Sequence, residues 1–184
     1  MIAWKPYCKI GDICRLGAFE IQAAKAGGIA RQEAREAARS ATVRRKGDAT
    51  REGNIKIHVD GFAGELAFCR LHNCWPDLSI GRTEPGDAVC AGGIVVDVKT
   101  RDQDWDLIVM PGKRGYDDAV DVFALMIGSF PGPYKFAGVM GRTELIQDHR
   151  IRRLGNGKES YLAKQSELVD LSTWYVAQRA RPAA

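Results

Sequence analysis

One short segment carries two carboxylates whose spacing would bring them together. Residues 86–99 read GDAVCAGGIVVDVK, with two apolar runs around a loop of small residues. If Cys90 pairs with Ile94 in an antiparallel hairpin, Asp87 lies opposite Asp97, and opposed residues have Cβ atoms about 5 Å apart. Like charges at that distance repel each other. A divalent cation is expected between them, because Mg²⁺ prefers carboxylate and water oxygens as ligands.

Lys99 adds a protein cation to the same place. It follows Asp97 by two positions, and the two share one face because side chains alternate along a strand. Two alternatives remain open. The hairpin slips by one residue if only Gly92 and Gly93 form the turn, and the two aspartates then no longer face each other. In the other alternative, the acids are a solvated pair at a strand end that Lys99 partly neutralises.

A third acid lies in an apolar segment earlier in the chain. Residues 61–68 read GFAGELAF, which predicts a helix, and Asp60 is its expected N-terminal cap. Glu65 is the one charged residue of this segment. Burial of a carboxylate is costly unless it meets a cation. Glu65 is therefore either an exposed helix residue or a further ligand for a metal ion or a water molecule.

The order of a helix glutamate, an aspartate and an Asp-x-Lys resembles the PD-(D/E)xK nuclease superfamily. The resemblance covers about residues 60–145 and is greatest to compact phage and prophage members. It implies a restriction-endonuclease-like fold in which the carboxylates and one backbone carbonyl hold Mg²⁺, with Mn²⁺ able to substitute. It also implies that the lysine orients or activates the attacking water. Carried over to this sequence, the metal ligands are Glu65, Asp87, Asp97 and Val98, and the lysine is Lys99.

One position departs from the family pattern. The residue before Asp87 is Gly86, where the family name has a proline. A literal Pro-Asp pair occurs at Pro76 and Asp77, in a loop-like stretch that gives Asp77 no hairpin partner at Asp97. Asp87 is therefore the expected ligand.

The resemblance implies hydrolysis of DNA phosphodiester bonds by a metal-dependent endonuclease of phage or prophage type. The alternative from another class is a non-catalytic nucleic-acid-binding or phage-assembly protein that keeps the fold. All four motif residues are present, which favours the enzyme. Another type of metal hydrolase is disfavoured, because His58, His72 and His149 are scattered and provide no ligand pair. DNA is the expected partner, and a homodimer is left open.

Basic residues precede the motif. Residues 18–26 and 29–46 predict two helices that Gly27 and Gly28 separate. Arginines recur at positions i, i+4 and i+8 of the second helix, so one face carries a positive stripe that either contacts phosphates or is simply solvated. The net charge of +4 agrees with a polyanionic partner but does not identify one. The nucleic-acid-binding candidates are Arg31, Arg35, Arg39, Arg44, Arg45 and Lys46.

The whole pattern predicts one α/β domain over residues 1–184, with a central mixed β-sheet flanked by helices. Its expected parts are a helical N-terminal region (1–53), a catalytic core (54–145) and a C-terminal helical and loop part (146–184). Apolar runs bounded by Pro-Gly pairs predict that further strands join the hairpin in one sheet. The strands are expected at 107–110, 120–127 and 134–140, helices at 143–150 and from Ser172, and a basic loop at 150–158.

The cysteines and the chain start suggest a reducing compartment. The five cysteines have irregular spacing, which predicts reduced thiols rather than a disulfide framework. Cys69, His72 and Cys74 are close enough to suggest a structural metal, although buried free thiols are the more common case. The sequence has no apolar run of membrane-spanning length and no secretory signal, so a cytoplasmic protein without membrane contact is expected.

Overall fold

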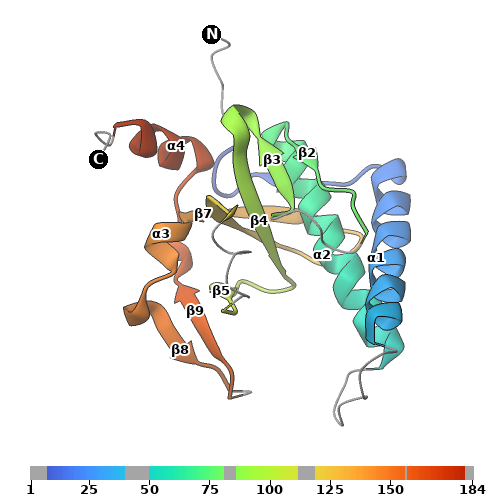
Figure 1. Cartoon of the computed structure of the whole chain (residues 1–184). Helices are drawn as coiled ribbons and strands as arrows, with labels where there is room; N and C mark the ends of the chain where they lie inside the picture. Colours follow the sequence, from blue (N-terminus) through green and yellow to red (C-terminus); the bar gives the residue numbers. More distant parts are fainter. Residues whose placement is uncertain (1–7, 40–49, 81–85, 112–118, 156, 181–184) are drawn as a thin grey trace.

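The computed structural model describes residues 8–39, 50–80, 86–111, 119–155 and 157–180 (Figure 1). A curled mixed sheet forms the centre of the molecule. Helices α1 (Ala18–Arg39) and α2 (Arg51–His72) lie together on one side of it, and a smaller second sheet lies toward the other side (Figure 1). Helix α4 (Leu171–Ala180) contributes Leu171 and Trp174 to the same hydrophobic cluster as α2. The chain is therefore an α/β protein, as the sequence predicted.

Helix α1 (Ala18–Arg39) runs without interruption through the two glycines expected to break it. A Cβ atom on Gly27 would lie 2.2 Å from the ring of Phe62, and one on Gly28 would lie 2.7 Å from the backbone nitrogen of Val59. Both partners belong to α2 (Arg51–His72). The prediction of a break was wrong, because the glycines serve to bring the two helices into close contact.

Helix α2 begins ten residues earlier than the sequence suggested. Its N-cap is Thr50, whose hydroxyl accepts a hydrogen bond from the Gly53 N–H at 3.1 Å. Asp60, predicted to be the cap, lies inside the helix. Its carboxylate accepts hydrogen bonds from the Phe130 N–H and from Lys56. Asp60 therefore anchors a distant loop, and the prediction that it caps the helix was wrong.

The central sheet has six strands in the order β1-β7-β6-β4-β3-β2. Strands β4 and β6 are parallel, and all other neighbouring pairs are antiparallel, so the prediction of a mixed sheet was correct. The strands are β1 (Ile13–Cys14), β2 (Trp75–Pro76), β3 (Ala88–Cys90), β4 (Ile94–Arg101), β6 (Val122–Ile127) and β7 (Tyr134–Gly141).

The hairpin of β3 and β4 has the predicted register. Cys90 pairs with Ile94, and the two following pairs on each strand continue this alignment. Gly92 and Gly93 in the connecting turn have φ values of 82° and 78°, a region that favours glycine over other residues. The one-residue slip is therefore excluded.

A second sheet of three strands was not foreseen. Its order is β5 (Leu107–Val109), β9 (Glu159–Ala163) and β8 (Ile151–Arg153). The sequence placed the first of these strands in the central sheet and interpreted residues 150–158 as a loop. The remaining helices are α3 (Arg142–Leu145) and α4 (Leu171–Ala180), with 3₁₀ turns at Ala91–Gly93, Asp148–Arg150 and Gln165–Glu167. Ser172 therefore lies inside α4 and is not its cap.

Two hydrophobic clusters fill the interior, one on each face of β4. The larger cluster packs α2 against the central sheet and includes Ala63, Ala67, Phe68, Val96 and Val98. The smaller cluster joins the opposite face to the second sheet and includes Leu107, Phe123, Leu125, Met140 and Ala163. Strand β4 is therefore held from both sides, which fixes the residues at its end.

Two of the five cysteines are oxidised, contrary to the prediction. Cys74 and Cys90 form a disulfide between the end of α2 and strand β3. Cys8, Cys14 and Cys69 are free and buried. In the part of the chain that the structure describes, no helix is both long enough and apolar enough to cross a membrane.

Candidate active site

Three carboxylates from separate segments converge beside the end of strand β3. Glu65 comes from α2, Asp87 directly precedes β3, and Asp97 lies within β4. Each is at least nine-tenths buried, with exposed fractions of 4%, 4% and 3%. Charged side chains are rarely buried unless they are paired with an opposite charge or a metal ion. Three buried carboxylates in one place therefore indicate a candidate functional site.

Backbone hydrogen bonds hold Asp87 in place. Its N–H donates to the Val96 carbonyl at 2.7 Å, and its Oδ2 accepts from the Val98 N–H at 2.8 Å. The N–H and C=O of one strand residue point to the same side, so the Val98 carbonyl also faces the edge where Asp87 lies. The carbonyl that the family resemblance implied as a ligand is therefore directed toward the carboxylates.

The charges of the other two acids act on Asp87. Burial raises the pKa of Asp87 well above its usual value, and the nearby charges of Glu65 and Asp97 raise it further. Lys99 and the hydrogen bond from Val98 act in the opposite direction. A cation bound beside Asp87 would therefore lower its pKa again.

Two protein cations contact the other two acids. The Lys99 ammonium forms an ion pair with Asp97. Arg31 from α1 donates to Glu65 at 2.7 Å from Nη1 to Oε1, and its guanidinium stacks 4.3 Å from the centre of the Phe62 ring. The close helix contact at Gly27 and Gly28 places Arg31 within reach of Glu65.

Asp77 does not belong to the cluster. Its carboxylate accepts hydrogen bonds from the N–H and the hydroxyl of Ser79, both at 2.8 Å. The backbone N–H of Asp77 donates to the carbonyl of Asp87. The structure thus brings Asp87, and not the literal Pro-Asp pair, into contact with the charges around Asp97.

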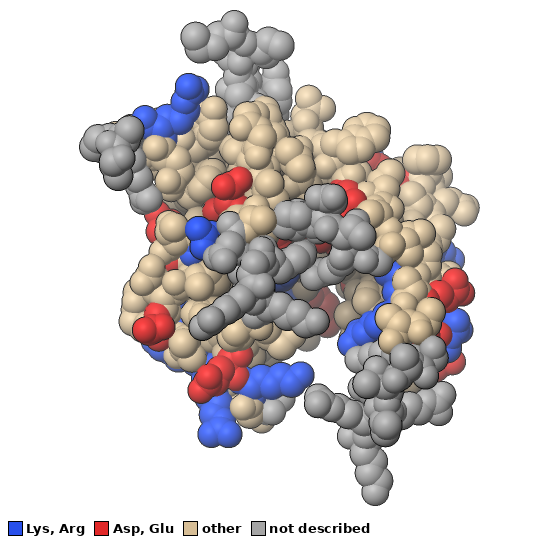
Figure 2. All heavy atoms as spheres, in the orientation of Figure 1, with Lys and Arg blue, Asp and Glu red and all other residues tan. Residues whose placement is uncertain are grey.

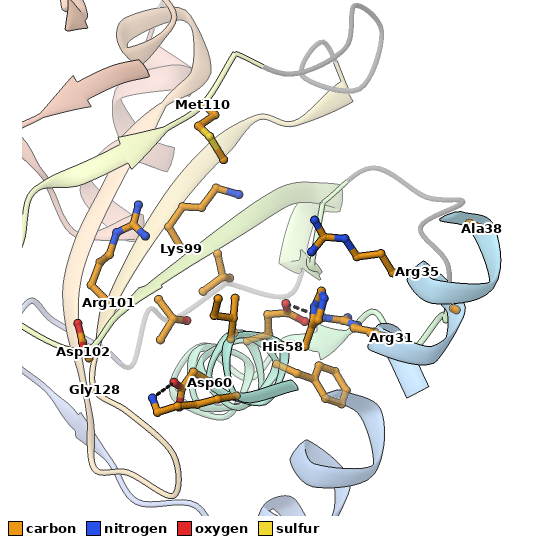
Figure 3. A pocket seen from close by; sticks show the side chains of 18 residues that line it. Arg31, Arg35, Ala38, His58, Asp60, Lys99, Arg101, Asp102, Met110 and Gly128 are labelled. Carbon is orange, nitrogen blue, oxygen red and sulfur yellow. Dashed lines mark hydrogen bonds and ion pairs between the residues drawn. The ribbon is translucent and has the colours of Figure 1, made fainter. Parts of the chain in front are cut away.

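A pocket of about 840 Å³ opens between α1, α2 and the end of β4 (Figure 3). Glu65 and Lys99 line it, and Figure 3 shows Lys99 from β4 and Arg35 from α1 directed into the same space. Figure 2 shows a hollow between the sheet and the two helices, with basic side chains on the helical side. Among the described residues, five cations line the pocket together with three acids: Arg31, Arg35, Lys56, Lys99 and Arg101, and Asp60, Glu65 and Asp102.

The predicted basic stripe is only partly described. Arg31 and Arg35 line the pocket. Arg39 is the last residue of α1, and its side chain lies outside the described part, as do Arg44, Arg45 and Lys46 entirely. Lys56 and Arg101 were missed. Arg101 follows Lys99 by two positions on β4, so strand alternation alone could have indicated it.

The ligand types present suit Mg²⁺, but two of the three carboxylates are paired with Lys99 and Arg31 in this structure. Carboxylate and carbonyl oxygens are the ligands that this ion prefers, and Glu65, Asp87, Asp97 and Val98 provide them. Among the described residues, no three His, Cys, Asp or Glu side chains are placed to hold one metal ion. To hold an ion at all three carboxylates, Lys99 and Arg31 would have to move away from their acids.

The sequence left open a structural metal at Cys69, His72 and Cys74, and no such site is formed in the described part of the chain. Cys74 is bound in the disulfide with Cys90. Cys69 is a free, buried thiol, and burial raises its pKa to about 12. His72 lies between the rings of Phe68 and Phe136. These residues are part of the hydrophobic interior.

No family model and no curated protein matches the chain. Fold and site define an α/β protein with a buried carboxylate cluster beside a cationic pocket. Any activity has to be inferred from the geometry of that pocket.

Proposed function

We propose that the chain is a metal-dependent nuclease that hydrolyses DNA phosphodiester bonds, with Mg²⁺ as its ion and Mn²⁺ as a substitute. An endonuclease of phage or prophage type, in the restriction-endonuclease-like class, is the specific form proposed. One observation carries the proposal: Glu65 of α2, Asp87 before β3, and Asp97 and Lys99 of β4 lie close together beside a pocket lined by cations. An anionic substrate would find charge complementarity there.

The roles follow from the chemistry of the side chains. A bound divalent cation supplies a nucleophile at neutral pH and stabilises developing negative charge on phosphate oxygens. Glu65, Asp87, Asp97 and the Val98 carbonyl would hold it. Lys99 is partly exposed to the pocket, so its ammonium can leave Asp97 to orient the attacking water and stabilise the transition state.

Arg31 and Arg35 would bind the substrate rather than react with it. Both project from α1 toward the pocket that holds Lys99 (Figure 3). Arginine presents several N–H donors in a planar fork that suits phosphate oxygens. Each would fix a phosphate beside the carboxylates, which raises the effective concentration of the bond to be cleaved.

A second candidate function is supported by the ion pairs themselves. Lys99 already neutralises Asp97, and Arg31 already neutralises Glu65. A protein with this arrangement could bind nucleic acid in the pocket without cutting it. This is the non-catalytic nucleic-acid-binding or phage-assembly alternative.

The test is a cleavage assay on supercoiled and linear DNA with Mg²⁺, Mn²⁺ or EDTA. The wild type should cleave with either metal and not with EDTA. Asp97→Asn and Lys99→Gln should each lose cleavage while their thermal melting curves stay cooperative. Asp104→Asn is the matched control, because Asp104 is an exposed carboxylate that pairs with Lys135 away from the pocket.

The outcomes separate the two candidates. Cleavage that both variants retain would contradict the assignment of these residues. DNA binding without cleavage under any metal condition would support the non-catalytic alternative. Nicking of supercoiled circles would identify the activity as endonucleolytic.

A further inference from the structure

The candidate reactive groups are recessed and not displayed on the surface. The three carboxylates are almost fully buried, and Lys99 has about a quarter of its side chain exposed. A phosphate that reaches Lys99 has to enter the pocket. Duplex DNA is stiff and carries its phosphates along a continuous outer surface. A single strand bends easily and can direct one phosphate inward.

The pocket lining is also more apolar than a phosphate site requires. Ala34 and Ala38 of α1, Ile57 of α2 and Met110 beyond β5 all line it together with the cations. Ile57 and Met110 are 62% and 58% exposed, so apolar surface is open to a ligand. In Figure 3, Met110 lies above Lys99 and Ala38 lies at the end of α1. Cations and apolar side chains therefore face the same space.

This combination matches an unpaired nucleotide better than a base pair. In a duplex the base faces are stacked on their neighbours, and a protein reaches only their edges through the grooves. Single-strand-binding sites combine a positive groove with aromatic side chains on which bases stack, and pockets for an unpaired base use aromatic or apolar side chains. The pocket volume of about 840 Å³ lies within the range of about 300–1,000 Å³ that encloses small organic ligands.

We propose that the pocket binds single-stranded DNA, with one unpaired base against Ala34, Ala38 and Ile57 and the adjoining phosphate at Lys99 and Arg35. The inference rests on the proposed function, since it places the strand at the nuclease site. Unpaired DNA is then the preferred substrate, and duplex DNA is bound more weakly because its bases cannot enter the pocket.

The first measurement is binding in EDTA, so that cleavage does not interfere. Fluorescence anisotropy compares a labelled 15-nucleotide single strand with a hairpin duplex of the same sequence. The single strand should bind at least about tenfold more tightly, because its free base face can contact the apolar side chains of the pocket and a paired base cannot. A single strand of the same length without bases should lose this advantage while it keeps its phosphates.

A neutral substitution tests the apolar surface separately from the charges. Ile57→Asn should weaken single-strand binding about fivefold, because the base then meets less apolar side-chain area. The slope of affinity against salt concentration should stay unchanged, since no charge is altered. Ile13→Asn is the matched control, because Ile13 is 61% exposed and lies on β1 outside the pocket.

The two proposals fail in different ways. Duplex binding as tight as single-strand binding, or an Ile57→Asn variant with wild-type affinity, overturns the unpaired-base site. Cleavage of duplex and single strand at equal rates with Mg²⁺ also overturns it and leaves the nuclease proposal standing. Tight single-strand binding that depends on Ile57, without cleavage under any metal condition, retains the binding site and removes the nuclease.

Discussion

Glu65 and His72 are two polar side chains buried on the same face of helix α2. They are seven residues apart, which is close to two helical turns, and each is only 4% exposed. Glu65 pairs with Arg31 and lines the large pocket. His72 packs between Phe68 and Phe136, and neither ring nitrogen has a hydrogen-bond partner among the described residues.

The difference teaches that burial of a polar group does not by itself mark a functional site. Burial lowers the pKa of His72 to about 4, so the ring is neutral at neutral pH and behaves as a flat apolar group. Glu65 instead lies beside Asp87, whose pKa its charge raises, and beside a cation from another helix. Partner charges and an opening to solvent, together with burial, distinguish the site.

The largest effect is expected from substituting Glu65 and His72 in turn and comparing cleavage by the two variants. Glu65→Gln should lower metal-dependent DNA cleavage about 100-fold or more, as is typical when one group that stabilises a charged transition state is removed. His72→Phe should cleave at the wild-type rate. Initial rates of supercoiled DNA nicking with Mg²⁺ measure both. Equal loss in the two variants would mean that Glu65 acts through the fold alone.

The second prediction concerns the pH dependence of stability. The pKa of His72 is about 4 in the folded chain and about 6.5 when unfolded. Between these values the unfolded state binds the extra proton, so stability falls as pH falls from 6.5 to 4. The two pKa values imply a loss of about 3 kcal/mol from this residue.

The His72→Phe variant isolates this contribution. Urea unfolding of the wild type and the variant at pH 7 and pH 4 should give a smaller pH difference for the variant. An unchanged difference would assign the acid sensitivity to other groups. Asp12 and Asp170, whose charges raise the pKa of His72 slightly, are the next residues to test.

Two glycines of α2, Gly61 and Gly64, differ in how closely they approach neighbouring residues. A Cβ atom on Gly64 would lie 1.9 Å from the Thr100 hydroxyl of β4, whereas one on Gly61 would meet nothing within 4 Å. Gly64→Ala should therefore destabilise the fold by about 1–3 kcal/mol through overpacking. Gly61→Ala should stabilise it by about 0.5–1 kcal/mol through helix propensity.

Cleavage adds a second readout to this glycine pair. Gly64 directly precedes Glu65, so a shift of α2 away from β4 also moves the carboxylate. Chemical denaturation and nicking rates of both variants provide the check. A Gly64→Ala protein with wild-type stability would show that α2 can move away from β4 at little cost.

The smallest expected effect concerns the cations around the Glu65 pocket. Arg35→Gln should weaken DNA binding about equally for all sequences and lower the salt slope by roughly one, because one phosphate is no longer neutralised. Arg15→Gln, an exposed arginine outside that pocket, is the control. Affinities at several salt concentrations decide between an arginine that binds phosphate and one that is merely solvated. An unchanged slope for Arg35→Gln would favour the solvated face.

Local patterns in the sequence were sufficient to predict strands β3 and β4, which carry part of the candidate site. The alternation on both sides of Gly92 and Gly93 predicted the register of β3 and β4, which is paired as far as Ala88 and Val96, the neighbours of Asp87 and Asp97. Turn residues and strand periodicity act over a few positions, so a single sequence contains them. The roles of these residues in catalysis remain predictions.

Features that depend on distant partners were misread. The sequence predicts a helix break at Gly27 and Gly28, because the residues they touch, Phe62 and Val59, lie more than thirty residues away. Asp60 was taken for a cap because the amide it binds, that of Phe130, is 70 residues further on. In each case the residue type has the local preference that the prediction relied on, but in the folded chain the residue makes a tertiary contact instead.

The disulfide between Cys74 and Cys90 gives this chain two covalent forms. It closes a ring that contains Asp87, and a ring of that size stabilises a fold by about 3 kcal/mol in the chain-entropy model. A preparation kept in dithiothreitol carries five thiols, whereas an air-oxidised one carries three. Two samples of one sequence then differ covalently at strand β3, beside the carboxylates. A thiol count by alkylation and mass spectrometry identifies which form was assayed.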